Sequence, residues 1–163
     1  SSDLTNRRTD RWGGDAARRA QFLIDVFDAC AAEIGTERIG IRLSPADYMS
    51  EMKHTDRDEQ ALIIALRHLE HRRAAYIHVG IEQDVIYDYL NGTPTDFLRQ
   101  NTSSVIIANG GYAPEQAAAS IAAGRADLHS FGRAFLANAD LVEKLKNGVP
   151  LASYDRSIYD SME

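Results

Sequence analysis

Short apolar runs alternate with longer amphipathic segments along the whole chain. The apolar runs are typical of buried strands and fall near 38–43, 75–79, 104–108 and 127–131. Between them, apolar residues recur at helical spacing over about 16–34, 56–72, 95–100, 114–123 and 139–147. Helices that alternate with strands in this way are typical of a parallel sheet built from right-handed crossovers.

The ends of several predicted helices carry residues that start and stop helices. Asp15 stands where an N-cap belongs, and either Thr55 or Asp56 can cap the second helix. Gly35 and Gly124 follow the first and fourth helices, where glycine can leave the helical conformation without a steric penalty. These signals support the alternation that the apolar pattern predicts.

The length of the chain limits which α/β fold it can form. Its 163 residues suit one domain, whereas a closed eight-stranded α/β barrel takes about 250 residues. An open sheet of four parallel strands would leave two bare edges and one uncovered face. No strand is followed by the GxGxxG turn of the dinucleotide-binding fold. We therefore predict that residues 1–163 form half of a (β/α)8 TIM barrel: four parallel strands with flanking helices, completed by another polypeptide.

Composition excludes several classes of function. The net charge of −6, without a basic stripe, argues against a nucleic-acid partner. No apolar run approaches the ~20 residues that span a bilayer, and the polar N-terminus does not resemble a signal peptide. We expect a cytoplasmic protein without a membrane partner. Cys30 is the one cysteine, which excludes an internal disulfide, and its place in an apolar stripe predicts a buried structural thiol.

Two of the apolar runs end in glycine and lead into helical patterns. The first ends at Asn109, Gly110 and Gly111, and the second at Gly132 and Arg133. Glycine lets backbone N–H groups approach a phosphate, helix N-termini add partial positive charge, and arginine supplies a forked donor. Each turn alone is an ordinary loop. Since neighbouring loops of a parallel sheet lie side by side, the pair predicts a phosphate site.

The run RIGIRL places Arg42 inside a strand that should be buried on both faces. A buried arginine is costly unless it is paired with an anion or with strong acceptors. The position therefore predicts a bound anion or a polar ligand near this strand.

Several segments resemble the C-terminal half of the Old Yellow Enzyme family, the flavin-dependent ene-reductases. They are NRRTDRWGG at 6–14, RAQF at 19–22, IGIRLSP at 39–45, ANGGY at 108–112 and FGRAFLANADL at 131–141. The resemblance runs over about 4–159. It implies a barrel that binds FMN at the C-terminal ends of its strands. It further implies that NAD(P)H reduces the flavin and that hydride then passes to an electron-poor alkene such as an enone.

The resemblance also implies roles for individual residues. Arg42 matches the strand-five arginine that contacts the N1/C2-carbonyl edge of the flavin, where a fixed cation favours the anionic reduced ring. Residues 109–111 match the first phosphate loop, and Gly132 with Arg133 match the second. Both assignments agree with what the residues predict without the family.

The chain departs from the family where the chemistry should be. The His-x-x-Asn or His-x-x-His pair that binds the substrate carbonyl is absent, as are the proton-donating tyrosine and the whole N-terminal half. None of the five histidines has the required context, and no cluster has metal-ligand spacing. We therefore assign no catalytic residue and no metal ligand to this chain. Glu82 and Asp84 could line the substrate side, although a solvated acidic loop is the simpler interpretation.

Three hypotheses follow. The first is half of a divided ene-reductase, joined by an N-terminal half-barrel polypeptide. The second is a catalytically inactive fragment or assembly subunit that associates with itself, as a homo-oligomer, to cover its open edges. The third is another phosphate-binding barrel enzyme, such as one that handles a sugar phosphate, but Arg42 and the WGG segment speak against it. We prefer the first.

Overall fold

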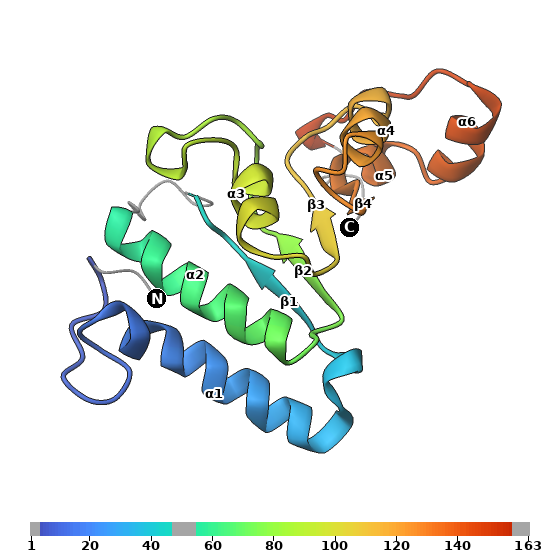
Figure 1. Ribbon diagram of the computed structural model, residues 1–163. Helices are drawn as coiled ribbons and strands as arrows, with labels where there is room; N and C mark the ends of the chain where they lie inside the picture. The colour runs from blue at the N-terminus through green and yellow to red at the C-terminus, as the bar shows by residue number, and fades with distance from the viewer. Residues whose placement is uncertain (1–3, 47–54, 158–163) are drawn as a thin grey trace.

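Four parallel strands form one sheet, and they lie in the sheet in their order along the chain (Figure 1). They are β1 (Gly40–Leu43), β2 (Tyr76–Val79), β3 (Ile106–Ala108) and β4 (Leu128–His129). The computed structural model describes residues 4–46 and 55–157. A sequential order without reversal is that of neighbouring barrel strands, and it lacks the switch point of a doubly wound sheet.

Helices separate and follow the strands. They are α1 (Ala16–Ile34), η1 (Thr36–Arg38), α2 (Asp56–His71), η2 (Asp88–Leu90), α3 (Pro94–Asn101), α4 (Pro114–Ala122), α5 (Gly132–Ala137) and α6 (Leu141–Asn147). Five of them match the predicted ranges, while η1, η2 and α5 were not predicted. The strands are shorter than predicted: η1 occupies the start of the first run, and α5 begins directly after the last. In Figure 1, α4, α5 and α6 gather at one end of the sheet, away from α1 and α2. Among the described residues, no helix is both long and apolar enough to cross a bilayer.

The predicted caps of α1 and α2 are present. The Asp15 carboxylate accepts a hydrogen bond from the backbone N–H of Arg18 at 2.9 Å, and Gly35, with φ of 87°, ends α1. Thr55 rather than Asp56 is the N-cap of α2, and its N–H donates to the Asp58 carboxylate at 3.1 Å. These bonds satisfy backbone groups that a helix end leaves without a partner.

The N-terminal loop is fixed onto α1. The indole N–H of Trp12 donates to Asp25 at 2.8 Å, and the Arg11 guanidinium lies 4.7 Å from the centre of the Trp12 ring. The buried Arg19 donates to the carbonyl of Gly14 at 2.6 Å and to the carbonyl of Arg57 at 2.7 Å. The Arg19 bonds join this loop to the start of α2.

The two faces of the sheet differ in burial. We call the face that carries Gly40, Arg42, Tyr76, His78, Val105, Ile107 and Leu128 the open face. The covered face carries the alternate residues Ile41, Leu43, Ile77, Val79, Ile106, Ala108 and His129. On the covered face, most apolar side chains are fully buried, and they pack against α1, α2 and α3 through Phe27, Leu66, Leu69, Phe97 and Leu98. The core therefore lies between the covered face and these helices.

The prediction of a buried Cys30 is wrong. Helix α1 packs through Ala20, Ile24, Phe27 and Ala31, whereas Cys30 is exposed on a neighbouring stripe with Phe22 and Val26. The apolar residues of α1 cover a wider part of the helix surface than the part that is buried. An apolar position on α1 therefore does not by itself predict a buried side chain.

Candidate functional site

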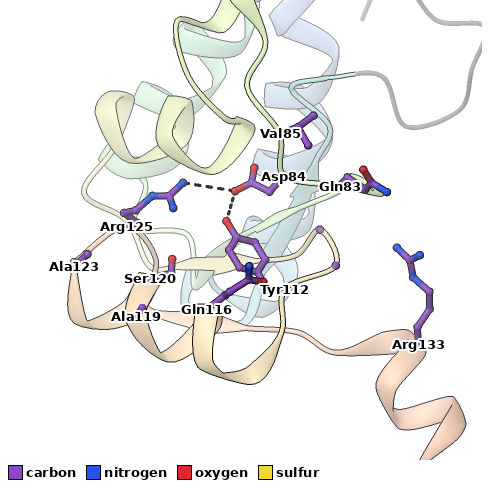
Figure 2. A pocket seen from close by; sticks show the side chains of 12 residues that line it. Gln83, Asp84, Val85, Tyr112, Gln116, Ala119, Ser120, Ala123, Arg125 and Arg133 are labelled. Atoms are coloured by element: carbon purple, nitrogen blue, oxygen red, sulfur yellow. Dashed lines mark hydrogen bonds and ion pairs between the residues drawn. The ribbon is translucent and has the colours of Figure 1, made fainter. Parts of the chain in front are cut away.

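A pocket of about 620 Å³ opens beside the glycine loop that follows β3 (Figure 2). Its walls come from the loop after β2, the glycine loop, the length of α4 and the start of α5. Three of the six predicted site residues line it: Gly110, Gly111 and Arg133. Gly132 adjoins Arg133 at the start of α5 but does not line the pocket.

The two predicted turns lie together at this pocket. Arg133 Nη2 lies 3.8 Å from where a Cβ atom of Gly111 would stand, and it donates to the carbonyl of Glu82 at 3.1 Å. Gly110 and Gly111 have φ of 128° and 76°, values that favour glycine. A Cβ atom on Gly110 would stand 2.5 Å from the amide nitrogen of Asp84. Both glycines are therefore required by the backbone here, while their role as phosphate ligands stays a prediction.

Asp84 lines the pocket, and its carboxylate is the buried centre of a hydrogen-bond network. Its side chain is 1% exposed, so the interpretation of a solvated acidic loop is wrong for this residue. The carboxylate accepts hydrogen bonds from the hydroxyl of Thr93 and the N–H of Thr95, both at 3.1 Å. It also accepts from the hydroxyl of Tyr112, and Arg125 lies 3.9 Å away (Figure 2). Sequence reasoning missed this network, although Tyr112 lies within the ANGGY segment.

The two arginines at the pocket differ in whether they form ion pairs. Arg125 pairs with Asp96 at 2.7 Å as well as with Asp84. Despite burial, the hydrogen bonds from Arg125 and Thr93 hold the pKa of Asp96 below its usual value. Arg133, by contrast, has no ion pair within the described ranges 4–46 and 55–157. The uncompensated charge of Arg133 at the glycine loop is the feature best able to receive an anion.

Tyr112 keeps its proton at neutral pH. Burial, together with the hydrogen bond to Asp84, raises the pKa of Tyr112 to about 12. Its ring meets the imidazole of His129 edge-on, with the ring centres 4.5 Å apart. Tyr112 is therefore a fixed hydrogen-bond donor between the pocket and the covered face of the sheet.

The other two predicted residues, Arg42 and Asn109, lie on a separate polar row at the open face. Arg42 is opposite His78 across β1 and β2 and is exposed, so the prediction that strand packing buries it is wrong. It is exposed because, among residues 4–46 and 55–157, no second layer covers the open face. Asn109 donates to the hydroxyl of Ser130 at 3.1 Å, and His78 Nε2 lies 2.9 Å from the same oxygen.

The two strand histidines serve different surroundings. Burial, and then the nearby charge of Arg42, lowers the pKa of His78 below its usual value. His129 faces the helices, and burial lowers its pKa as well. Neither belongs to a metal site: in the described part of the chain, no three His, Cys, Asp or Glu side chains gather to hold a metal ion.

Comparison with known proteins identifies relatives over nearly the whole chain. A sequence profile of the NADH:flavin oxidoreductase / NADH oxidase family matches residues 1–152. The chain is 36% identical over 161 residues to 12-oxophytodienoate reductase 1 of Oryza sativa subsp. japonica. It is 35% identical over 161 residues to 12-oxophytodienoate reductase 2 of Arabidopsis thaliana. Each of these alignments covers 96% of this chain but only 42% of the relative.

Solved structures show the same partial match. Morphinone reductase superposes with a TM-score of 0.82 at 33% identity, and the Old Yellow Enzyme of Trypanosoma cruzi with 0.85 at 26% identity. Both superpositions cover 97% of this chain and 42% of the solved chain. The resemblance to Old Yellow Enzymes and the half-barrel fold are thus confirmed, and FMN with a nicotinamide reductant is confirmed at the level of the family. The chain belongs to the NADH:flavin oxidoreductase / NADH oxidase family and spans about two fifths of the length of these relatives.

Proposed function

We propose that this chain is the C-terminal half of a flavin-dependent ene-reductase. Once an N-terminal half-barrel polypeptide joins it, the completed barrel reduces electron-poor alkenes such as enones, using NAD(P)H and FMN. The observation that carries the proposal is that two features occur together. Arg133, without an ion pair among the described residues, lies at a glycine-lined pocket, and the sheet face beside that pocket is exposed. Family membership supports it, and one solved morphinone reductase holds tetrahydroNAD. Membership also weighs against the sugar-phosphate alternative.

The residues present fit the phosphate end of FMN. The pocket has room for a phosphate, and its glycine loop has backbone conformations that side chains rarely adopt. Two arginines lie at the pocket. Arg125 is paired with two carboxylates, whereas the guanidinium of Arg133 donates to a backbone carbonyl and can still pair with an anion. In this proposal, Gly110, Gly111 and Arg133 hold the phosphate, and Gly132 sets the backbone from which Arg133 extends.

The polar row on the open face fits the ring end of the same cofactor. When bound, FMN supplies the hydride chemistry, and this chain supplies orientation and charge. In this proposal, Arg42 would hold the ring edge, where its positive charge would favour the reduced form. Asn109 and His78 share the hydroxyl of Ser130, so they hold the row that lies between Arg42 and the glycine loop. The substrate-binding pair and the proton donor come from the N-terminal half.

Reconstitution tests the proposal. This chain is mixed with FMN and with the N-terminal half of a relative, such as the 12-oxophytodienoate reductase of rice at 36% identity. Visible flavin absorbance and enone-dependent oxidation of NAD(P)H are expected only when both halves are present. Stoichiometric FMN binding by this chain as a monomer would contradict the proposal. A flavin-free mass of two copies in native mass spectrometry would favour the self-associating subunit instead.

Substitutions in the reconstituted protein test the individual roles. Arg133→Ala should weaken FMN binding by about 1.5–3 kcal/mol, the range for a hydrogen bond to a charged group. Arg67→Ala, an exposed arginine on α2, is the matched control and should leave the affinity unchanged. Arg42→Ala should slow reduction of the flavin more than it weakens binding, which stopped-flow absorbance separates. An unchanged FMN affinity in Arg133→Ala removes Arg133 from the site.

A further inference from the structure

We propose that Asp84 is the positioning residue of the glycine loop and holds Gly110 to Tyr112 in the conformation that receives a phosphate. This inference rests on the proposed function and deepens it. It concerns a residue that acts through the loop and does not itself touch the ligand. Its basis is the set of contacts that one buried carboxylate makes with three separate segments.

Asp84 forms hydrogen bonds with both ends of the loop. Its backbone N–H donates to the carbonyl of Gly110 at 3.2 Å, and its carboxylate accepts from the hydroxyl of Tyr112. Gly111 lies between these two anchor points and faces Arg133. The loop residue nearest to the pocket's cation is therefore held from both sides by one neighbour.

The carboxylate is in turn held from behind. Thr93 and Thr95 at the start of α3 each donate to it at 3.1 Å. Arg125 lies 3.9 Å away, and Asp96 orients Arg125 through a contact of 2.7 Å. A buried carboxylate is costly unless it is paired and hydrogen-bonded, so this many partners make a single position of Asp84 favourable. Asp84 thus connects the glycine loop to the start of α3, and these contacts restrict the movement of the loop.

Only a carboxylate suits this position. An ionised carboxylate accepts at two oxygens and donates nothing, whereas an amide of the same shape has one acceptor oxygen and an NH₂ group. Tyr112 and Thr93 donate to Oδ2 of Asp84, and the backbone N–H of Thr95 donates to Oδ1. In Asp84→Asn, the NH₂ group would face donors at one of these positions, so either the Tyr112–Thr93 pair or the Thr95 N–H would lose its acceptor. Tyr112 is a donor throughout the neutral range, because its hydroxyl keeps its proton.

Asp84 lines the pocket, but the burial of its carboxylate makes it a poor direct ligand. The side chain is 1% exposed, and its negative charge would repel a phosphate at short range. Its donors and Arg125 offset that charge, while Arg133 stands on the far side of the glycine loop with charge available. Asp84 therefore affects a phosphate through the backbone of the loop.

The test uses inorganic phosphate and the full chain, followed by ¹H–¹⁵N NMR of the Gly110 and Gly111 amides. Asp84→Asn should weaken phosphate binding at least tenfold, and Tyr112→Phe should weaken it less. Asp127→Asn is the matched control, because Asp127 also pairs with an arginine, Arg99, and accepts a backbone N–H, but has no described contact with the loop or with Asp84. It should bind phosphate within twofold of the unmodified chain.

A second control separates positioning from general stability. Leu66→Ala removes a fully buried side chain of α2, outside the network, and should lower the urea midpoint without changing phosphate affinity. If Asp84→Asn does not fold, Tyr112→Phe decides the question with the same measurement. Unchanged phosphate affinity in the folded variants overturns this inference alone. No phosphate binding by the unmodified chain overturns both this inference and the phosphate site of the proposed function.

Discussion

The covered and open faces of the sheet are built from the same four strands, yet only one of them is buried. On the covered face, Ile77, Val79 and Ile106 are 0% exposed. On the open face, Tyr76 is 39% exposed and Leu128 is 53% exposed. Both faces nonetheless carry large apolar side chains, which is the composition of strands that are buried on both sides.

This difference separates what the chain completes by itself from what it leaves to another layer. The covered face has its helices, its core and the Asp84 network in place. The open face has apolar side chains along the strands and the polar row of Arg42, His78, Asn109 and Ser130 at their ends, with nothing over them in the described residues. An exposed apolar surface beside polar residues is typical of an interaction site. In the proposed function, the N-terminal half covers it.

The largest expected effect is a difference in stability loss between substitutions of two neighbouring residues that lie on opposite faces. Ile106→Ala should lower the free energy of unfolding by about 2–5 kcal/mol, because it opens a cavity in the core. Val105, its neighbour in the chain, is 43% exposed, and Val105→Ala should cost less than about 1 kcal/mol. Urea unfolding followed by circular dichroism measures both. Equal losses would mean that the open face is already covered in solution, for example by a second copy.

A smaller effect should appear only when the open face is used. Leu128→Asp should leave the urea midpoint of this chain unchanged, since the side chain is 53% exposed. It should weaken joining to an N-terminal half by about 1.5–3 kcal/mol, because joining then buries a charge. Isothermal calorimetry or flavin absorbance measures the association. Ile121→Asp on α4, at a side chain that is 44% exposed outside the sheet, is the control and should join normally.

The fold followed from local patterns because those patterns are set by near neighbours in the chain. Alternating apolar runs and capping residues such as Asp15 and Gly35 predicted the elements and their order. Burial was predicted less well, since it depends on what lies over each face. Arg42 and Cys30 are both exposed, one because a layer is missing and the other because α1 buries a narrower stripe than its apolar residues define.

The site shows the same limit. Two glycine turns predicted the pocket that Gly111 and Arg133 share, because neighbouring strands of a parallel sheet end at one edge. The partners of Asp84 come from the start of α3, the glycine loop and the turn before β4. Their convergence depends on how α3 and α4 pack, which spacing along the chain does not encode. A polar residue that adjoins a required glycine is the signal that would have found it.

The smallest effect concerns the two strand histidines, one on each face. Burial lowers the pKa of His78 and of His129, and Arg42 adds to the shift of His78. Around His129, the charge of Asp84 opposes burial and that of Arg125 adds to it. Because both folded pKa values lie below the unfolded value, the unfolded chain binds more protons as pH falls through about 6.5. Stability should therefore be greatest above this pH and decrease below it.

His129 on the covered face should affect the pH dependence of folding, and His78 on the open face should affect the pH dependence of joining. His129 is already enclosed, so His129→Gln should flatten the unfolding profile of this chain between pH 7.5 and 5.5, by less than about 1 kcal/mol. His78 is enclosed further only when the open face is covered, so acid should weaken joining, and His78→Gln should remove most of that dependence. Urea midpoints and association constants at the two pH values measure the two effects. If joining strengthened in acid, a protonated His78 would have to meet an acidic partner, and the proposal of a simple apolar and neutral contact at this face would fail.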